Sequence, residues 1–129
     1  MVKVQFCRDQ PYARFIASGR LDLAEVVAAF QRWQAHPDFS PKVDLLWDLR
    51  ACDWQPALED FLLIRESILK QPRRLWRGKH IACVVDSATN AALIDAQFGA
   101  GPWPFVWRGF LNTKTAEDWL LSVKESSLG

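Results

Sequence analysis

Residues 45–54 read LLWDLRACDW, a run of large apolar side chains that gives way to charged ones. The apolar run begins at Val43 and ends at Leu49, and only Asp44 and Asp48 interrupt it. A short, nearly continuous run of this kind is typical of a strand that is buried on both faces. The charged residues after it mark the point where this strand leaves the core.

Strand and helix signals alternate on both sides of this stretch. Residues 2–7 and 13–19 predict two strands, and the polar, proline-containing segment 8–11 between them predicts a hairpin turn. Asp22 and Glu25 form a capping pair that predicts a helix ending before Pro37. Further helices are predicted over 56–70, 89–98 and from Asn112 or Thr113 onward, and further strands over 81–85 and 105–110.

The resulting order is β-β-α-β-α-β-α-β-α. It predicts a single α/β domain over residues 1–129, with a mixed, mostly parallel five-stranded sheet, an N-terminal antiparallel hairpin and about four helices. In such sheets, ligands bind beyond the carboxyl ends of the parallel strands. Segments 48–54, 86–90 and 109–113 are therefore expected along one edge of the sheet.

Composition narrows the class of protein. The chain has 129 residues, half of them hydrophobic, and a formal net charge of +1. This balance argues against an obligate nucleic-acid binder or a strongly membrane-attracted protein, although it allows a local basic patch. Three cysteines without a CxxC motif, an N-terminus without an apolar signal core and the lack of a membrane-length apolar run predict a cytoplasmic protein.

Three segments carry a resemblance to a known family: LLWDLR (45–50), IACVVD (81–86) and FVWRGFLNTKTAEDWLLS (105–122). In these segments the chain resembles the bacterial SpoIIAA-like proteins, whose fold is shared by STAS domains and the lipid-binding Sec14 domains. The resemblance covers nearly the whole chain and implies that fold. Most members of the family have no assigned activity.

The resemblance also bears on regulation. STAS anti-anti-sigma factors are phospho-switches, in which a serine at the start of the helix after this strand takes phosphate and breaks a protein contact. Here the corresponding residues 50–55 contain no serine or threonine, so the resemblance implies binding without that switch. Asp53 is expected near the helix start, as a cap or as a permanent negative charge.

A candidate binding rim follows from the predicted edge and from unusual single residues. Arg65 falls near the middle of the apolar arc of its predicted helix, so it must extend into solvent, pair with a carboxylate such as Asp48, or face a cavity. Leu63 falls on the polar side of that helix and is either a subunit contact or an ordinary exposed leucine without a role. The candidate rim residues are Asp48, Arg50, Cys52, Asp53, Trp54, Arg65, Asp86 and Trp103.

Two connections remain open to more than one interpretation. The stretch KQPRRLWRGKH (70–80) holds five lysines and arginines, no acid and one tryptophan. It is expected near the opposite sheet edge, either as a solvated connection or as a surface for phosphates and a stacked base or for anionic lipid. The segment GAGPWP (99–104) is either a lid over a pocket, with Trp103 as its apolar face, or a stiff connection.

The sequence predicts binding rather than catalysis. His36 and His80 lack metal-ligand spacing, and no nucleophile, phosphate-loop or paired-carboxylate motif occurs, so no enzyme, metal or cofactor is expected. We expect a non-catalytic module that binds a protein partner or a second copy of itself. We do not expect it to bind nucleic acid. The alternative is a carrier or sensor of a small apolar or amphipathic ligand in a Sec14-type pocket, with Arg65 anchoring an anionic head. A third hypothesis is thiol chemistry at Cys52.

Overall fold

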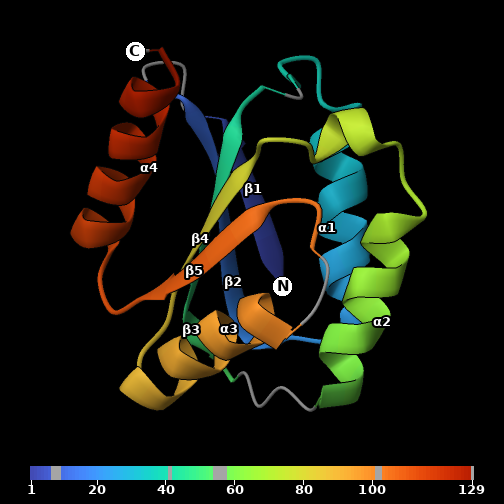
Figure 1. Cartoon of the computed structure of the whole chain (residues 1–129). Helices are drawn as coiled ribbons and strands as arrows, with labels where there is room; N and C mark the ends of the chain where they lie inside the picture. The colour runs from blue at the N-terminus through green and yellow to red at the C-terminus, as the bar shows by residue number, and fades with distance from the viewer. Residues whose placement is uncertain (7–9, 41, 54–57, 101–102, 129) are drawn as a thin grey trace.

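The computed structural model describes residues 1–6, 10–40, 42–53, 58–100 and 103–128. One sheet has the strand order β1-β2-β3-β4-β5; β1 is antiparallel to β2, and the other pairs are parallel. The predicted element order and mixed sheet are therefore confirmed (Figure 1). The elements are β1 (Val2–Phe6), β2 (Tyr12–Arg20), α1 (Leu23–Ala35), β3 (Asp44–Asp53), α2 (Leu58–Leu69), the 3₁₀ turn η1 (Arg73–Leu75), β4 (His80–Val84), α3 (Ala88–Ala100), β5 (Val106–Phe110) and α4 (Thr113–Leu128).

The helices form two layers around the sheet. Each crossover moves one strand further in the same direction, so right-handed connections place α1, α2 and α3 on one face. Helix α4 follows the last strand and covers the other face (Figure 1). The buried side chains accordingly form a large cluster under α1, α2 and α3 and a smaller one that contains Ala116 and Leu120 of α4.

Strand β3 lies between these two layers. Leu45 and Trp47 belong to the large cluster, whereas Leu46, between them, belongs to the α4 cluster. All three side chains are at most 5% exposed. This alternation confirms the prediction of a strand buried on both faces.

An extra residue in β3 changes this alternation further along the strand. Ile16 of β2 pairs with Asp48, but Ser18 pairs with Ala51. Between these two pairs β3 therefore contains one residue more than β2. A bulge of this kind rotates the following side chains to the other face. The strand continues to Asp53, four residues beyond the predicted end at Leu49, because it keeps pairing with the end of β2.

Aromatic side chains fill the larger cluster. The rings of Phe15 and Trp47 stack with centroids 4.5 Å apart, and Phe30 of α1 meets Trp47 edge-on at 5.4 Å. Trp76, which is fully buried, extends the cluster beyond the end of α2 through Phe30 and Trp33. Much of the tryptophan content therefore belongs to the core rather than to a surface.

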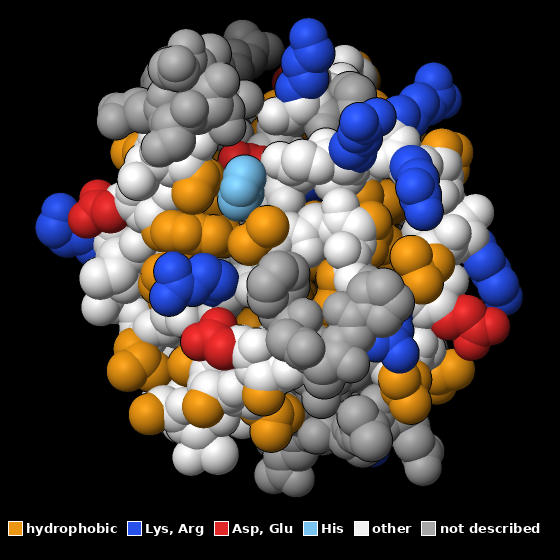
Figure 2. All heavy atoms as spheres, in the orientation of Figure 1, with side chains coloured by type: hydrophobic (Ala, Val, Ile, Leu, Met, Phe, Trp, Pro, Cys, Tyr) orange, Lys and Arg blue, Asp and Glu red, His pale blue; other side chains and the backbone are white. Residues whose placement is uncertain are grey.

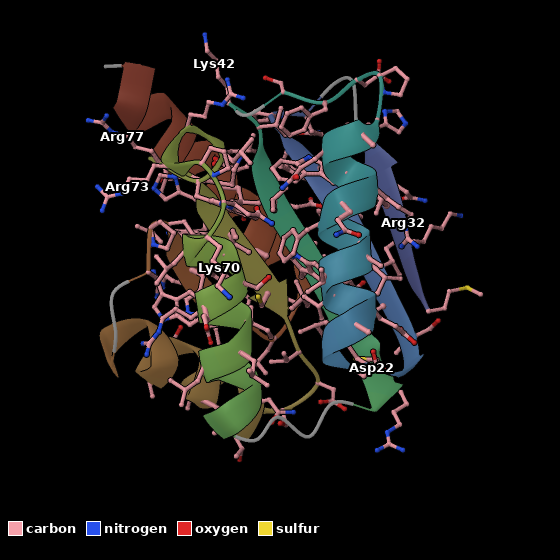
Figure 3. All side chains as sticks on the ribbon, turned by 90° about the vertical axis from the view of Figure 1, so that its right-hand side faces the viewer. Asp22, Arg32, Lys42, Lys70, Arg73 and Arg77 are labelled. Atoms are coloured by element: carbon pink, nitrogen blue, oxygen red, sulfur yellow. The ribbon has the colours of Figure 1, made fainter. Side chains whose placement is uncertain are left out.

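A charged side chain covers a backbone group at each edge of the sheet. At β5, the Gly109 amide donates to Asp95 Oδ1 of α3 at 2.9 Å. At β1, the guanidinium of Arg32 of α1 donates to the carbonyl of Val2; Arg32 is labelled in Figure 3. Both contacts reach from helices of the same layer, and both occupy groups that face away from the neighbouring strand.

Helix α3 approaches β5 so closely that position 109 has no room for a side chain. A Cβ atom on Gly109 would lie 2.7 Å from both the Cα and the carbonyl oxygen of Ala91. These are backbone atoms, which cannot rotate away. Glycine at 109 therefore sets the distance between α3 and the edge strand.

We expect Gly109→Ala to lower the free energy of unfolding by at least about 2 kcal/mol, because overpacking against backbone forces α3 outward. Urea denaturation measures this loss. Gly78→Ala is the matched control, since a Cβ there meets nothing within 4 Å and only the positive φ of 73° opposes it; about 1 kcal/mol is expected. Equal losses for the two variants would contradict the close approach.

Candidate functional site

The carboxyl ends of the parallel strands meet at one edge, as predicted. Asp48 of β3 pairs with Val84 of β4, and Val84 pairs with Phe110 of β5. Segments 86–90 and 109–113 therefore lie at the same edge of the sheet as Asp48, at the lower end of the sheet in Figure 1. The exposed Asp86 lies at this edge. Helix α3 begins there, where Ser87 Oγ accepts from the Asn90 amide at 3.2 Å.

Asp48 and Arg50 form a local ion pair. The Arg50 Nε and Nη2 atoms donate to the two Asp48 oxygens at 3.0 and 2.8 Å, and the Arg50 amide adds a third bond at 3.2 Å. These hydrogen bonds from Arg50 hold the pKa of the Asp48 carboxyl below its ordinary value. Arg14, which pairs with Glu117 of α4, adds to this effect. The pair thus lies on the α4 face of the sheet.

Arg65 does not pair with Asp48, in contrast to the partner considered from the sequence. Helix α2 covers the opposite face, so the sheet separates the two side chains. The Arg65 guanidinium carbon instead lies 5.9 Å from the centroid of the Trp103 ring, within cation–π range. The half-buried Arg65 therefore finds an aromatic face.

Trp103 does not share the edge of Asp48 and Asp86. It lies just before β5 begins and packs against Trp107, with ring centroids 4.7 Å apart. This position is at the amino ends of the parallel strands. The rim that was predicted as one surface is thus divided, with Asp48, Arg50 and Asp86 at one end and Arg65 with Trp103 toward the other.

The remaining rim residues follow the bulge. Cys52 is half-buried against the large cluster, and its Sγ donates to the Leu49 carbonyl at 3.1 Å, so it does not face the same side as Asp48. Asp53 is the last residue of β3, and α2 begins at Leu58. Asp53 still pairs with Arg20 of β2, and its predicted role near the start of the helix stays a prediction, because residues 54–57 lie outside the described residues. Trp54 lies outside the described residues.

A small apolar cavity lies between the sheet and the layer of α1, α2 and α3. Its volume is about 60 Å³, below the ~150 Å³ of a cavity that admits benzene. In this conformation it cannot accept a lipid chain. Its lining is wholly apolar and consists of Leu21, Val26, Phe30, Trp47, Leu49, Ile64, Ile68, Ile81, Cys83, Ile94, Phe105 and Trp107.

A larger, basic groove lies at the carboxyl end of α2. It encloses about 600 Å³ and is lined by Leu69, Arg73, Arg74, Arg77, Trp103 and Pro104. Figure 2 shows Lys and Arg side chains gathered at the upper right, over the connection from α2 to β4 in Figure 1. The run of cations was visible in the sequence, but its meeting with Trp103 and Pro104, about thirty positions away, depends on the crossover through α3.

The side chains for thiol or metal chemistry are dispersed. Cys52 and His80 lie at opposite ends of their strands: His80 is beside Asp44 at the start of β3, eight residues before Cys52, or ~26 Å along the strand. Across the described ranges, no three His, Cys, Asp or Glu side chains converge as a metal site requires. Burial raises the pKa of the Cys83 thiol to about 12.

Comparison with solved structures supports the fold. The chain is similar to an uncharacterised protein of the DUF3478 family from Shewanella loihica PV-4, whose crystal structure has a SpoIIAA-like fold. The TM-score is 0.62 and the identity 17%, over 93% of this chain and 92% of the other. This chain therefore has a SpoIIAA-like fold, as the resemblance implied. No protein-family model and no curated protein sequence matches it.

The two described cysteines are expected to differ in reactivity. At pH 8, a pKa of about 12 leaves roughly one Cys83 thiol in ten thousand as the reactive thiolate. Iodoacetamide should therefore modify Cys52 while Cys83 stays unmodified, and urea should abolish the difference. Peptide mass spectrometry over time measures both. Modification of native Cys83 at the rate of Cys52 would refute the burial, and an inert Cys52 would remove the hypothesis of thiol chemistry there.

Proposed function

We propose that this chain, which has a SpoIIAA-like fold, is a non-catalytic binding module that contacts a protein partner or a second copy of itself through the outer face of α2. The observation that carries the proposal is a concentration of exposed leucines on this helix. Leu62, Leu63 and Leu69 are 42%, 48% and 51% exposed. We call these three residues the leucine face.

The leucine face differs from ordinary scattered exposure. Six large hydrophobic side chains are exposed among the described residues, and three of them lie within eight positions of one helix. Leu62 and Leu69 are seven residues apart, so they lie on the same side of α2. Covering each exposed leucine would contribute about 1 kcal/mol, since full burial of a leucine gives roughly 1.5–3 kcal/mol.

A charged pair lies among the side chains of the leucine face. Glu66 and Lys70 lie one turn apart between and beside the leucines and form an ion pair at 3.5 Å. Leu62 and Leu69, at positions i and i+7, have the spacing of the anchors by which an amphipathic helix docks in a groove of another protein, and the Glu66–Lys70 pair separates them from Leu63. The position of α2 at the outside of the molecule leaves this face open to such a partner (Figure 1).

A second candidate function rests on the cavity beneath α2. Its twelve apolar lining residues include Ile64 and Ile68 of the same helix. A small apolar group could enter as it stands, whereas an acyl chain would require α2 to move outward. This is the carrier or sensor alternative, with a ligand of few heavy atoms as its natural occupant.

To test the leucine face, Leu62→Gln/Leu69→Gln is compared with Leu111→Gln/Leu121→Gln, which removes two exposed leucines elsewhere. Light scattering over a concentration series detects self-association, and a pulldown from lysate at modest salt detects partners. We expect the wild type and the control to associate or retain a partner, and the α2 variant to lose this by at least tenfold, or about 1.4 kcal/mol. A clean monomer without retained partner contradicts the proposal.

The cavity is tested through the tryptophans that line it. If it binds an apolar ligand of few heavy atoms, butyrate changes the fluorescence of Trp47 and Trp107, decanoate does so only if α2 moves outward, and Ile64→Phe, which fills the space, abolishes the change. Mass spectrometry of an extract of the purified protein identifies any ligand that co-purifies. An unchanged fluorescence together with an empty extract would rule out this second function.

A further inference from the structure

Three arginines lie on the connection between α2 and β4, in and beside a 3₁₀ turn that is anchored to the core. The turn η1 is closed by the Trp76 and Arg77 amides, which donate to the Arg73 carbonyl at 3.0 and 2.8 Å. The fully buried Trp76 fixes it to the core, and its Nε1 donates to Gln71 Oε1 at 3.0 Å. Arg73, Arg74 and Arg77 are all exposed. In Figure 3, Arg73 and Arg77 project side by side away from the body of the molecule.

Apolar side chains line the same groove as these cations. Leu69, Trp103 and Pro104 line the groove together with the three arginines. Trp103 is held from behind by Trp107 and Phe105, and the guanidinium of Arg65 lies over its ring. The groove thus offers a fixed hydrophobic surface next to a cluster of positive charge.

The three groove arginines, Arg73, Arg74 and Arg77, have no carboxylate partner among the described side chains. The nearest acid along α2, Glu66, pairs with Lys70. The chain as a whole carries a net charge of only +1, so these three charges are a local concentration. Like charges this close repel one another, and a bound anion relieves that repulsion.

We propose that this groove binds an organic phosphate, with the phosphate held by Arg73, Arg74 and Arg77 and its apolar or planar part against Trp103 and Pro104. A phosphate monoester carries close to two negative charges, which matches three cations better than a single carboxylate does. A guanidinium group binds phosphate in a bidentate manner, with two parallel N–H groups donating to two phosphate oxygens. A groove of about 600 Å³ suits a ligand of the size of a mononucleotide. The proposal is independent of the leucine face, with which it shares only Leu69.

The test uses isothermal titration calorimetry of the full chain with adenosine monophosphate, and with adenosine as the uncharged probe. Arg73→Gln/Arg77→Gln removes two groove charges, and Arg74→Gln alone is a milder variant. Lys3→Gln/Arg20→Gln is the matched control, because it removes two exposed charges from β1 and from the far end of β2. Sedimentation with phosphatidylglycerol vesicles distinguishes a soluble phosphate from a lipid headgroup.

The expected result is binding of adenosine monophosphate but not of adenosine, with affinity at least about tenfold lower in the groove double variant, a smaller loss for Arg74→Gln, and a change below twofold in the control. The affinity should also fall as salt rises. Equal losses in the groove and control variants, no binding of adenosine monophosphate, or binding to vesicles alone would each overturn the proposal. The assay of the α2 leucine variant measures association with a protein, whereas calorimetry measures phosphate binding, so each proposal can fail without the other.

Discussion

The stacking of Trp47 on Phe15 is the contact on which the arrangement of this domain depends. It joins β2 to β3 within the sheet, and the same Trp47 ring receives Phe30 from α1. One indole therefore fixes both the parallel register of two strands and the distance of the helical layer above them. Because β3 is also buried beneath α4, every other element takes its place relative to this strand.

This core divides the surface chemistry into two ends. The carboxyl edge carries Asp48 and Arg50, which satisfy each other, and an ion pair that is already closed has little to offer a ligand. The amino end carries the three groove arginines beside Trp103, without carboxylates of their own among the described side chains. Ligands of parallel sheets usually bind at the carboxyl edge. In the described part of this chain, however, the arginines without a carboxylate partner lie at the amino end.

The sequence predicted elements better than the contacts between them. Apolar periodicity and capping residues located the five strands and four α-helices of the described residues, but not the short 3₁₀ turn, because these signals are local. The extra residue in β3 has no local signal: it arises from pairing with β2 beyond Ile16, and it turns Cys52 away from Asp48. Arg65 shows the same limit, since the helical wheel identified it as unusual but could not identify Trp103 as its partner. That contact joins residues 38 positions apart and exists only when α2 and the start of β5 are packed. The connection 70–80 was correctly placed at the opposite edge, but its apolar wall comes from another part of the chain.

The side chains of Arg32 and Asp95 at the two sheet edges have a consequence for crowded solutions. The unpaired edge of a sheet is a template on which a strand of another chain can pair, and such pairing leads to aggregation. Here an incoming strand would first have to displace a guanidinium from Val2 or a carboxylate from Gly109. One helix therefore exposes the leucine face while each of the two sheet edges has an outward backbone group occupied by a charged side chain.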